Sequence, residues 1–475
     1  MRGRPGPVRF GLLLGGVLLV AATTGIASAE SLCGPFDEAY SLAAAEPLAA
    51  DPGITTGSDG GDRPRSPGRI VELADAAEDG ASSDPRPAEG ADDATGSEAI
   101  LALPKDETGA LPTDFELGPG ARIRQSFFSP VVCATIARVT GPAGAALDEL
   151  VTVVPDTATV VPNDVYRSAA AELRPAPLEA ALAEAPRPDP YAALQYGLAV
   201  SGVRDARGLG AGAGVRVALL DSAPETGHGD LDATRIVGLD AAEKPPVGVH
   251  GTLMTGVIAA IEDNGFGIAG LAPRAEIVSI PVCRPRESGG ECTVFDLLRG
   301  FDRAFESESA IVNLALSGPP NALLERGVAR LEELGLVLVA AAGNEGSDLR
   351  RYPAAYPSVV GVGALDRAGR PFAAGNHGPW VELWAPGVEI LSTVPGNAFA
   401  FGDGTSLAAA HVTGVLAVLT SVTKDAKQAR GALFRAAQAG HRAPPTVVPP
   451  VCEVLARLGA VCEPPRRPAA EPPRR

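Results

Sequence analysis

Aromatic and basic residues are scarce in this chain of 475 residues. Aromatic residues make up only 4%, so the core of any folded domain must be built from aliphatic side chains. Lysine and arginine number 40 against 57 aspartate and glutamate residues, which gives a formal charge of −17. Such a chain lacks the cationic face that attracts phosphates and anionic lipids. We therefore expect no binding to nucleic acid and no attraction to an acidic membrane surface.

Long apolar runs are absent after residue 29, because no later stretch has 18 uninterrupted apolar residues. The one long apolar run, FGLLLGGVLLVAATTGIA, lies before that point: it follows Arg2, Arg4 and Arg9 and is closed by the small residues at 27–29. This order is typical of a secretory signal peptide, which we assign to 1–29. The alternative is a membrane anchor, which the glycines and threonines of the run disfavour. We predict a secreted (extracellular or periplasmic, cell-envelope) monomer without a stable membrane anchor.

Only six cysteines are present, and an even set in an oxidising compartment predicts disulfides. They are Cys33, Cys133, Cys283, Cys292, Cys452 and Cys462. Six cysteines allow about 15 pairings, and the sequence does not choose among them. Short spacing favours two local bonds, Cys283 with Cys292 and Cys452 with Cys462. Cys33 and Cys133 remain as the third pair.

Changes in composition divide the rest of the chain. Residues 30–120 are rich in Asp, Glu, Pro, Gly and Ser and predict a disordered acidic leader. Residues 121–172 contain a strand, helix, strand pattern and predict a small α+β unit. A linker at 173–190 precedes the main domain at 191–440. A cysteine-containing extension and a Pro/Arg-rich tail complete the chain at 441–475.

The main domain alternates short apolar strands, such as VRVALL and VLVAAA, with helical segments. Strands that are apolar throughout suit a parallel sheet covered by helices on both faces. We therefore predict an α/β fold with a doubly wound, mostly parallel sheet. The glycine-rich GLGAGAG at 208–214 comes before its strand, whereas a nucleotide-binding turn follows one, so we predict no nucleotide site.

Four polar residues stand at strand ends or helix starts, where open α/β sheets gather reactive groups. Asp221 ends the strand VRVALL, His250 opens a helix, Asn344 follows VLVAAAG, and Ser406 begins a long apolar helix. Singly, each residue is as well explained as a cap or a turn residue. Together they supply a hydroxyl nucleophile, an imidazole base, a carboxylate that orients the imidazole, and an amide donor. This set predicts acyl transfer.

The motifs around these residues resemble those of the subtilisin-like serine protease family, the subtilases. DSAPETGHGDL resembles the aspartate motif, HGTLMTGVIAA the histidine motif, VLVAAAGNEGS the asparagine motif and GTSLAAAHVTG the serine motif. Their order is also that of the family, and the resemblance covers about 191–420. It implies a subtilisin-like fold and a secreted serine endopeptidase. It also implies that Ser406 is the nucleophile, His250 the general base, Asp221 its orienting acid and Asn344 an oxyanion donor.

The resemblance has further implications for substrate, inhibitor and metal. The substrate is a polypeptide, and the α+β unit is a prodomain that inhibits the chain until self-processing between about Ser168 and Pro190. No cofactor is required for the chemistry, and a structural calcium ion is expected at Asp230 and Asn264. The substrate-pocket walls are formed by Leu314, Ala315, Leu316, Ser317, Gly318, Ala341, Ala342 and Gly343.

Three positions depart from the family pattern, namely Ala223, Leu253 and Ala410. None removes a group that transfers a proton or holds charge. Two alternatives remain: a secreted, catalytically impaired binding or surface protein with the same fold, and a relative that uses a carboxylate as base. The intact HGT at 250–252 disfavours the second. His228 and His411 are assigned structural roles near the site.

Overall fold

The computed structural model describes residues 97–104, 115–154, 158–169, 173–175, 189–233, 235–238, 245–286, 289–440 and 445–462. The predicted signal peptide, the leader before residue 97, most of the predicted linker and the tail after 462 lie outside these ranges.

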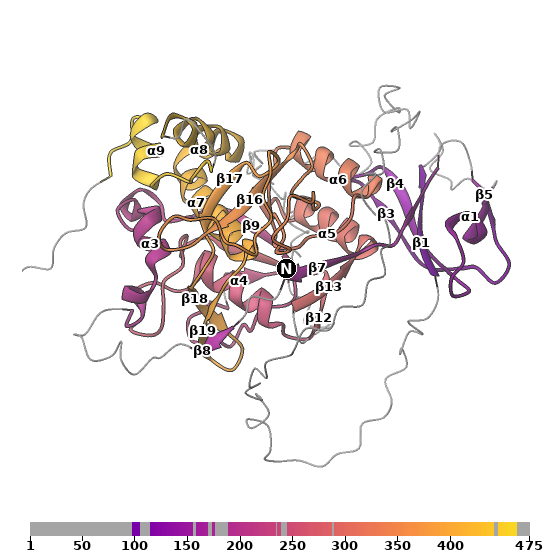
Figure 1. The fold of residues 1–475 in the computed structure, drawn as a ribbon, viewed down its shortest axis with the longest axis horizontal. Coiled ribbons are helices and arrows are strands. Elements are labelled where there is room, and N and C mark those ends of the chain that lie inside the picture. The colour runs from indigo at the N-terminus through magenta and orange to yellow at the C-terminus, as the bar shows by residue number, and fades with distance from the viewer. Residues whose placement is uncertain are drawn as a thin grey trace, which may run out of the picture.

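A seven-stranded parallel sheet forms the centre of the main domain (Figure 1). Its order is β10-β11-β9-β14-β15-β16-β17. Along β9, Val217 and Leu219 belong to one hydrophobic cluster and Ala218 and Leu220 to another, so both faces of the strand are buried. The predicted α/β fold with a doubly wound parallel sheet is confirmed. The strands are β9 (Arg216–Asp221), β10 (Ile236–Val237), β11 (Glu276–Pro281), β14 (Ile311–Leu314), β15 (Val337–Ala341), β16 (Val359–Leu365) and β17 (Leu383–Pro386).

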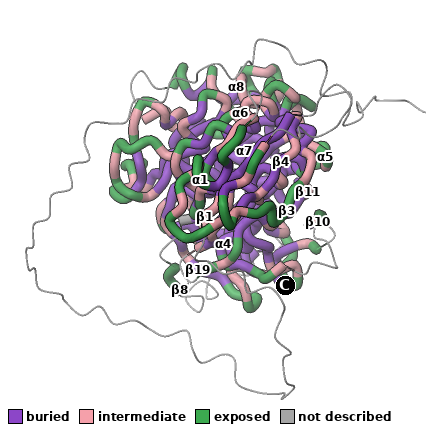
Figure 2. Tube along the Cα trace, turned by 90° about the vertical axis from the view of Figure 1, so that its right-hand side faces the viewer, coloured by how far each residue is buried: buried purple, intermediate pink, exposed green. Residues whose placement is uncertain are grey.

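Helices cover both faces of this sheet, and Figure 2 shows the buried chain gathered at the centre of the molecule. One face carries α4 (Val249–Ala259), α7 (Thr405–Thr423) and α8 (Ala426–Gly440), and the other carries α5 (Val294–Glu306) and α6 (Ala322–Glu333). Of the described helices of 18 residues or more, only α7 is apolar enough to span a membrane, and 94% of its apolar window is buried inside the protein. The smaller elements are η2 (Ala192–Leu194), α3 (Tyr196–Ser201), η3 (Arg207–Leu209) and α9 (Val451–Arg457).

An N-terminal unit built on a four-stranded antiparallel sheet lies beside α5 and α6 (Figure 1). One face of the sheet packs with α1, and the other joins the cluster that contains α5 and α6. The rings of Phe127 and Phe295 meet edge to face across this contact, with centroids 5.1 Å apart. Its elements are β1 (Ser97–Pro104), β3 (Arg122–Ser129), β4 (Ala134–Gly141), β6 (Thr159–Pro162), α1 (Leu147–Leu150) and the pair β2 (Glu116–Leu117) and β5 (Val151–Val153).

The predicted start of this unit at residue 121 is wrong. Composition predicts that the residues of strand β1 belong to the disordered leader, yet this strand lies between β4 and β6 and is buried from Ala99 onwards. The run AILALP is too short to outweigh the acidic, proline-rich sequence around it when composition is averaged. Its six buried residues nevertheless supply the middle of the sheet.

Two small antiparallel sheets join the region before residue 190 to the main domain. In the first, β7 (Val165–Ala169) pairs with β13 (Gly289–Thr293), which also pairs with β12 (Cys283–Arg286). In the second, β8 (Arg174–Pro175) pairs with β19 (Ala398–Gly402), which also pairs with β18 (Ile390–Val394). Residues predicted as the end of the α+β unit and the start of a linker are therefore held by the main domain.

Both predicted local disulfides are present. Cys283 and Cys292 join the two strands of the β12–β13 hairpin, and Cys452 and Cys462 close the turn after α9. Cys33 lies outside the described residues, so its predicted bond to Cys133 stays a prediction.

Candidate functional site

A buried carboxylate and an imidazole form the centre of the site. Asp221 is the last residue of β9 and is 1% exposed, while His250 is the second residue of α4 and is 4% exposed. The Nδ1 of His250 lies 2.7 Å from Oδ2 of Asp221. The other carboxylate oxygen accepts hydrogen bonds from the backbone N–H and the hydroxyl of Ser222. Both oxygens of this buried charge are therefore satisfied.

The opposite nitrogen of His250, Nε2, is buried and has no hydrogen-bond partner among the described residues. A carboxylate on Nδ1 favours the tautomer that carries its proton there, which leaves Nε2 as an acceptor. An unpartnered acceptor in a buried position is suited to taking a proton from a nucleophile.

Small residues let α4 begin this close to Asp221. A Cβ atom on Gly251 would collide with the backbone oxygen of Ser222, and one on Gly248 would collide with the Ser222 hydroxyl. The glycine of the HGT motif is thus required by the close approach of the helix to the end of β9, which sets the ring of His250 on the carboxylate.

Ser406 is the second residue of α7 and is 3% exposed. Its hydroxyl donates a hydrogen bond to the carbonyl oxygen of Ala315 at 3.3 Å. No hydrogen bond joins it to His250 in this conformation, since Nε2 has no partner among the described residues. The hydroxyl must therefore rotate away from Ala315 to reach a base. Catalytic hydrogen bonds often tighten in this way only when substrate binds.

Asn344 lies in the loop after β15 and is held against the start of α7. Its Oδ1 accepts hydrogen bonds from the backbone N–H and the hydroxyl of Thr405, at 3.0 and 2.9 Å. With the oxygen engaged, the Nδ2 group is left to donate. It lies 3.1 Å from where a Cβ atom on Gly404, two residues before Ser406, would stand. The amide is thus fixed beside the serine turn with its donor group available.

The predicted pocket walls lie at the carboxyl ends of β14 and β15. Leu314, Ala315, Leu316, Ala341 and Ala342 are buried. Ser317 is already paired with the chain itself, because its backbone exchanges two hydrogen bonds of 2.9 Å with Arg167 in β7. Gly318 and Gly343 complete this region of the loops.

The two residues predicted to bind calcium contact one another. The Nδ2 of Asn264 donates to Oδ1 of Asp230 at 2.9 Å, and the backbone N–H of Ile268 donates to Oδ2 at 2.6 Å. Burial is the largest cause that raises the pKa of Asp230, to about 7. In this arrangement the pair fixes a loop, and its role in calcium binding stays a prediction.

A second acidic residue, not predicted from the sequence, lies near this pair. Asp189 is buried, and its Oδ1 has no hydrogen-bond partner among the described residues. Burial raises the pKa of Asp189, and the negative charge of Asp189 in turn raises the pKa of Asp230. The site offers two buried carboxylates and one amide, which are the oxygen ligands that calcium prefers, although the positive charge of Arg204 already acts on Asp189 and lowers its pKa. Asp189 stands in the segment RPDP, where no pattern of residues indicates a ligand.

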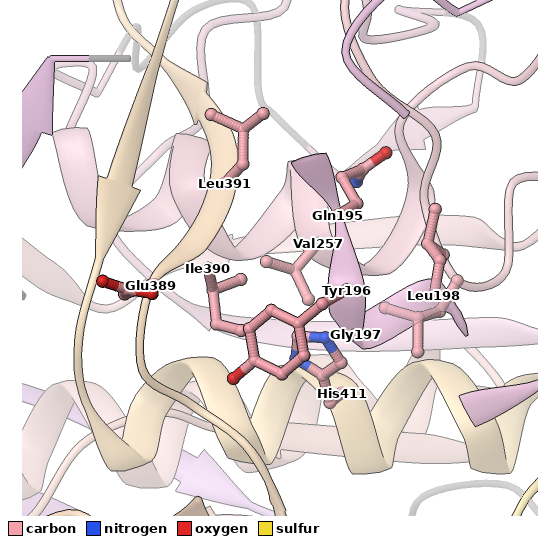
Figure 3. Close-up of a pocket in the computed structure, with 10 residues that line it drawn as sticks. Gln195, Tyr196, Gly197, Leu198, Val257, Glu389, Ile390, Leu391 and His411 are labelled. Carbon is pink, nitrogen blue, oxygen red and sulfur yellow. The ribbon is translucent and has the colours of Figure 1, made fainter. Parts of the chain in front are cut away.

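The other two motif histidines are packed structurally. The Nε2 of His228 donates a hydrogen bond to the carbonyl oxygen of Ala398 at 2.9 Å, while its Nδ1 accepts one from the backbone N–H of Asp230. His411 lies inside α7 with its ring against Gly197, in the small pocket of Figure 3. Burial lowers the pKa of His411 to about 4, so this ring is neutral at physiological pH.

Fold and site together define a class: an α/β protein with a doubly wound parallel sheet, a buried Asp–His pair, a serine at a helix start and a fixed amide. Residues 212–446 match the subtilase family. The chain is 36% identical over 229 residues to a thermophilic serine proteinase of Bacillus sp. (strain AK1), covering 47% of this chain and 56% of that protein.

Two further relatives support the assignment. Thermitase of Thermoactinomyces vulgaris is 33% identical over 252 residues, which cover 52% of this chain and 89% of thermitase. Subtilisin E of Bacillus subtilis (strain 168) is 34% identical over 218 residues, which cover 44% of this chain and 56% of subtilisin E. The chain belongs to the subtilase family. The match spans little more than half the length of the first and third of these relatives.

Proposed function

We propose that this chain is a secreted serine endopeptidase, made as a zymogen, that hydrolyses peptide bonds through an acyl-enzyme. The observation that carries the proposal is the buried contact of 2.7 Å between Oδ2 of Asp221 and Nδ1 of His250. The other ring nitrogen, Nε2, has no hydrogen-bond partner among the described residues. Ser406 is the second residue of α7, and Asn344 is held against the start of that helix by the backbone N–H of Thr405. The relatives, named as a serine proteinase and subtilisins, support the same chemistry.

In the first half of the reaction, Oγ of Ser406 forms a bond to the carbonyl carbon of the substrate while its proton passes to Nε2 of His250. Asp221 stabilises the imidazolium that results. The Nδ2 group of Asn344 and the backbone N–H of Ser406 donate hydrogen bonds to the oxyanion. Nε2 then returns the proton to the amine that leaves.

In the second half, water attacks the ester carbon and gives one proton to Nε2. The bond to Oγ breaks, the proton returns to Ser406, and the carboxylic product is released. Each step uses the same imidazole, which explains why a single buried base with one available nitrogen is sufficient.

The N-terminal unit is proposed as the intramolecular inhibitor. Its sheet packs on α5 and α6, and β7 pairs with Ser317 in the predicted substrate pocket. A chain that occupies its own pocket is expected to be inactive until it is cut, which supports the zymogen reading. The predicted signal peptide and the two disulfides support export.

Calcium is proposed as a structural ion only, held by Asp189, Asp230 and Asn264. Bound there, it would neutralise the two buried carboxylates and tie the segment before η2 to the loop after α4. It has no part in the proton transfers.

The test is the Ser406→Ala variant of the full chain. It is expected to hydrolyse no casein and to stay uncut, whereas the parent hydrolyses casein and loses its N-terminal unit. The measurement is casein hydrolysis together with the mass of the purified chain. Maturation of the variant in a purified system would disprove self-processing, and casein hydrolysis by the variant would disprove the assigned nucleophile.

A further inference from the structure

The loop that carries Asn344, the proposed oxyanion donor, is held by one buried side chain, Asn376. This residue lies between β16 and β17 and is 0% exposed. Strands β15 and β16 are parallel neighbours in the central sheet, so the loops that follow them leave the sheet at the same edge (Figure 1). Asn376 therefore meets residues 342–347, which we call the oxyanion loop.

The amide oxygen of Asn376 fixes the part of the oxyanion loop that follows the donor. Its Oδ1 accepts hydrogen bonds from the backbone N–H groups of Glu345 at 3.0 Å and Ser347 at 3.3 Å. Between them, the backbone N–H of Gly346 donates to the carbonyl oxygen of Ala374 at 2.8 Å. This half of the loop is thus bound to the segment 374–376.

Two N–H donors of Asn376 fix the part of the loop that precedes the oxyanion donor. Its Nδ2 donates to the carbonyl oxygen of Ala342 at 3.2 Å, and its backbone N–H donates to that of Gly343 at 2.9 Å. Gly343 has a φ of 101°, which favours glycine, and a Cβ atom there would lie only 2.6 Å from Nδ2. This close approach lets one amide bind the loop on both sides of Asn344.

Asn376 also engages the carboxylate of Glu345, the residue that directly follows the donor. Its Nδ2 donates to Oε2 of Glu345 at 2.6 Å, while Nε of Arg351 donates to Oε1 at 3.0 Å. Both carboxylate oxygens are therefore occupied by donors other than Asn344. A carboxylate free to accept from Nδ2 of Asn344 would compete with the oxyanion for the same donor.

The bonds of Asn376 complement the bonds that Thr405 makes. Thr405 orients the side chain of Asn344 by donating to its amide oxygen. Asn376 instead holds the backbone from which that side chain projects. Both are needed to place a donor, because a displacement of about 1 Å at a catalytic group can lower a rate about 10²-fold.

We propose that Asn376 is a positioning residue for the reaction. It holds the oxyanion loop so that Nδ2 of Asn344 meets the oxyanion, and it acts through Asn344 without touching a reacting atom. An amide is required because one buried side chain must both accept from backbone N–H groups and donate to oxygens. This inference rests on the proposed endopeptidase function and deepens it.

The experiment is a double-mutant cycle measured as kcat and KM on a peptide p-nitroanilide. It compares the matured parent with Asn376→Ala, Asn344→Ala and the double variant. Immobilised parent cuts any variant that matures slowly and is removed before the assay. Asn376→Ala is expected to lower kcat about tenfold and to change KM less than about twofold, because the donor is displaced and not removed.

The decisive comparison is the same substitution in the Asn344→Ala background. There, Asn376→Ala is expected to lower kcat less than about twofold, because the group that it positions is already absent. A merely structural role would lower kcat by the same factor in both backgrounds. Equal factors, an unchanged kcat in the single variant, or a loss confined to KM overturns the inference.

Gln195→Ala is the matched control, because Gln195 holds a different loop in the same way. Its Oε1 accepts from the backbone N–H of Ala269 at 2.9 Å, and its Nε2 donates to the carbonyl oxygen of that residue at 2.8 Å. That loop follows the carboxyl end of α4, whereas His250 opens the helix. The control is expected to lower the melting temperature and to keep the kcat of the parent. A loss of kcat equal to that of Asn376→Ala overturns the inference.

Asn376→Asp provides a second variant if Asn376→Ala does not fold. The aspartate keeps an oxygen for the two backbone N–H groups and loses the donor to Ala342 and Glu345. It is expected to lower kcat about fivefold when Asn344 is present and less than about twofold when it is absent. A parent that hydrolyses casein without this coupling overturns the inference alone. A parent that hydrolyses neither casein nor the p-nitroanilide overturns the proposed function.

Discussion

The Asp221–His250 contact shows how single residues set the chemistry. The carboxylate is enclosed at the end of a strand and is satisfied by Ser222 and the ring, so it holds the imidazole in one orientation. Glycines at 248 and 251 make the approach possible because any side chain there would meet Ser222. The pair is therefore a product of close backbone packing as much as of charge.

At the same scale, Asn344→Ala tests the oxyanion donor. Removal of the amide is expected to lower kcat about 10²–10³-fold with little change in KM, the range known for loss of this donor in subtilisin itself. The measurement is steady-state kinetics on a peptide p-nitroanilide.

Asn344 also holds Thr405, so a purely structural role must be distinguished. Equal melting temperatures for variant and parent, with kcat reduced, support the donor role. A rise in KM without loss of kcat contradicts it.

At the scale of elements, α5 connects the main domain to the N-terminal unit. Asp302 on this helix is 6% exposed, and one of its oxygens accepts hydrogen bonds from the Ser129 hydroxyl at 2.7 Å and from the Val131 N–H at 3.2 Å. Burial is the main cause that raises the pKa of Asp302, to about 7. The N-terminal unit thus covers an acid that is easier to bury with its proton than without it.

This contact predicts a pH dependence with a definite sign. The folded pKa of Asp302 lies above the ordinary value of about 3.9, so its contribution to stability is complete below about pH 4 and is lost as pH rises through about 7. We compare the uncut Ser406→Ala chain with and without the Asp302→Asn substitution. At pH 8 the substitution is expected to raise the melting temperature, and at pH 4.5 it is expected to change it less. The asparagine oxygen can accept the same two hydrogen bonds. A difference that is the same at both pH values contradicts the prediction.

Elements of the main domain were predictable from sequence because local signals agreed there. Apolar strands such as β9 and helices such as α6 carry their own pattern, and Asp221 stands at the end of a parallel strand. Strand β1 was missed because six buried residues sit within acidic, proline-rich sequence. The pairing of β7 with β13 and Ser317 joins residues more than 100 positions apart, so no local pattern encodes it.

Whole-molecule organisation follows from one sheet buried on both faces and a second unit docked against α5 and α6. After that unit, Arg167 of β7 pairs with Ser317, and β8 pairs with β19. Asp189 lies close enough to Asp230 for its charge to raise the pKa of that residue. The sequence does not indicate this proximity, because it depends on where the segment after residue 188 packs.

At the scale of the whole molecule, calcium removal tests the proposed ion. Calcium at about 100 times its Kd is expected to add about 2.7 kcal/mol to the free energy of unfolding. EGTA should remove this gain, measured as a fall in melting temperature. The Asp189→Asn variant is expected to lose most of the response. A melting temperature that does not change with calcium or EGTA contradicts the proposed site.

The central claim is that His250 activates Ser406, and covalent labelling measures this most directly. A serine-directed fluorophosphonate added to the matured protein is expected to modify one residue, found by peptide mass spectrometry at Ser406. The matured protein treated with a histidine-alkylating peptide chloromethyl ketone is expected to lose this labelling. Absence of an adduct at Ser406, or an adduct formed equally fast after His250 is alkylated, contradicts the account.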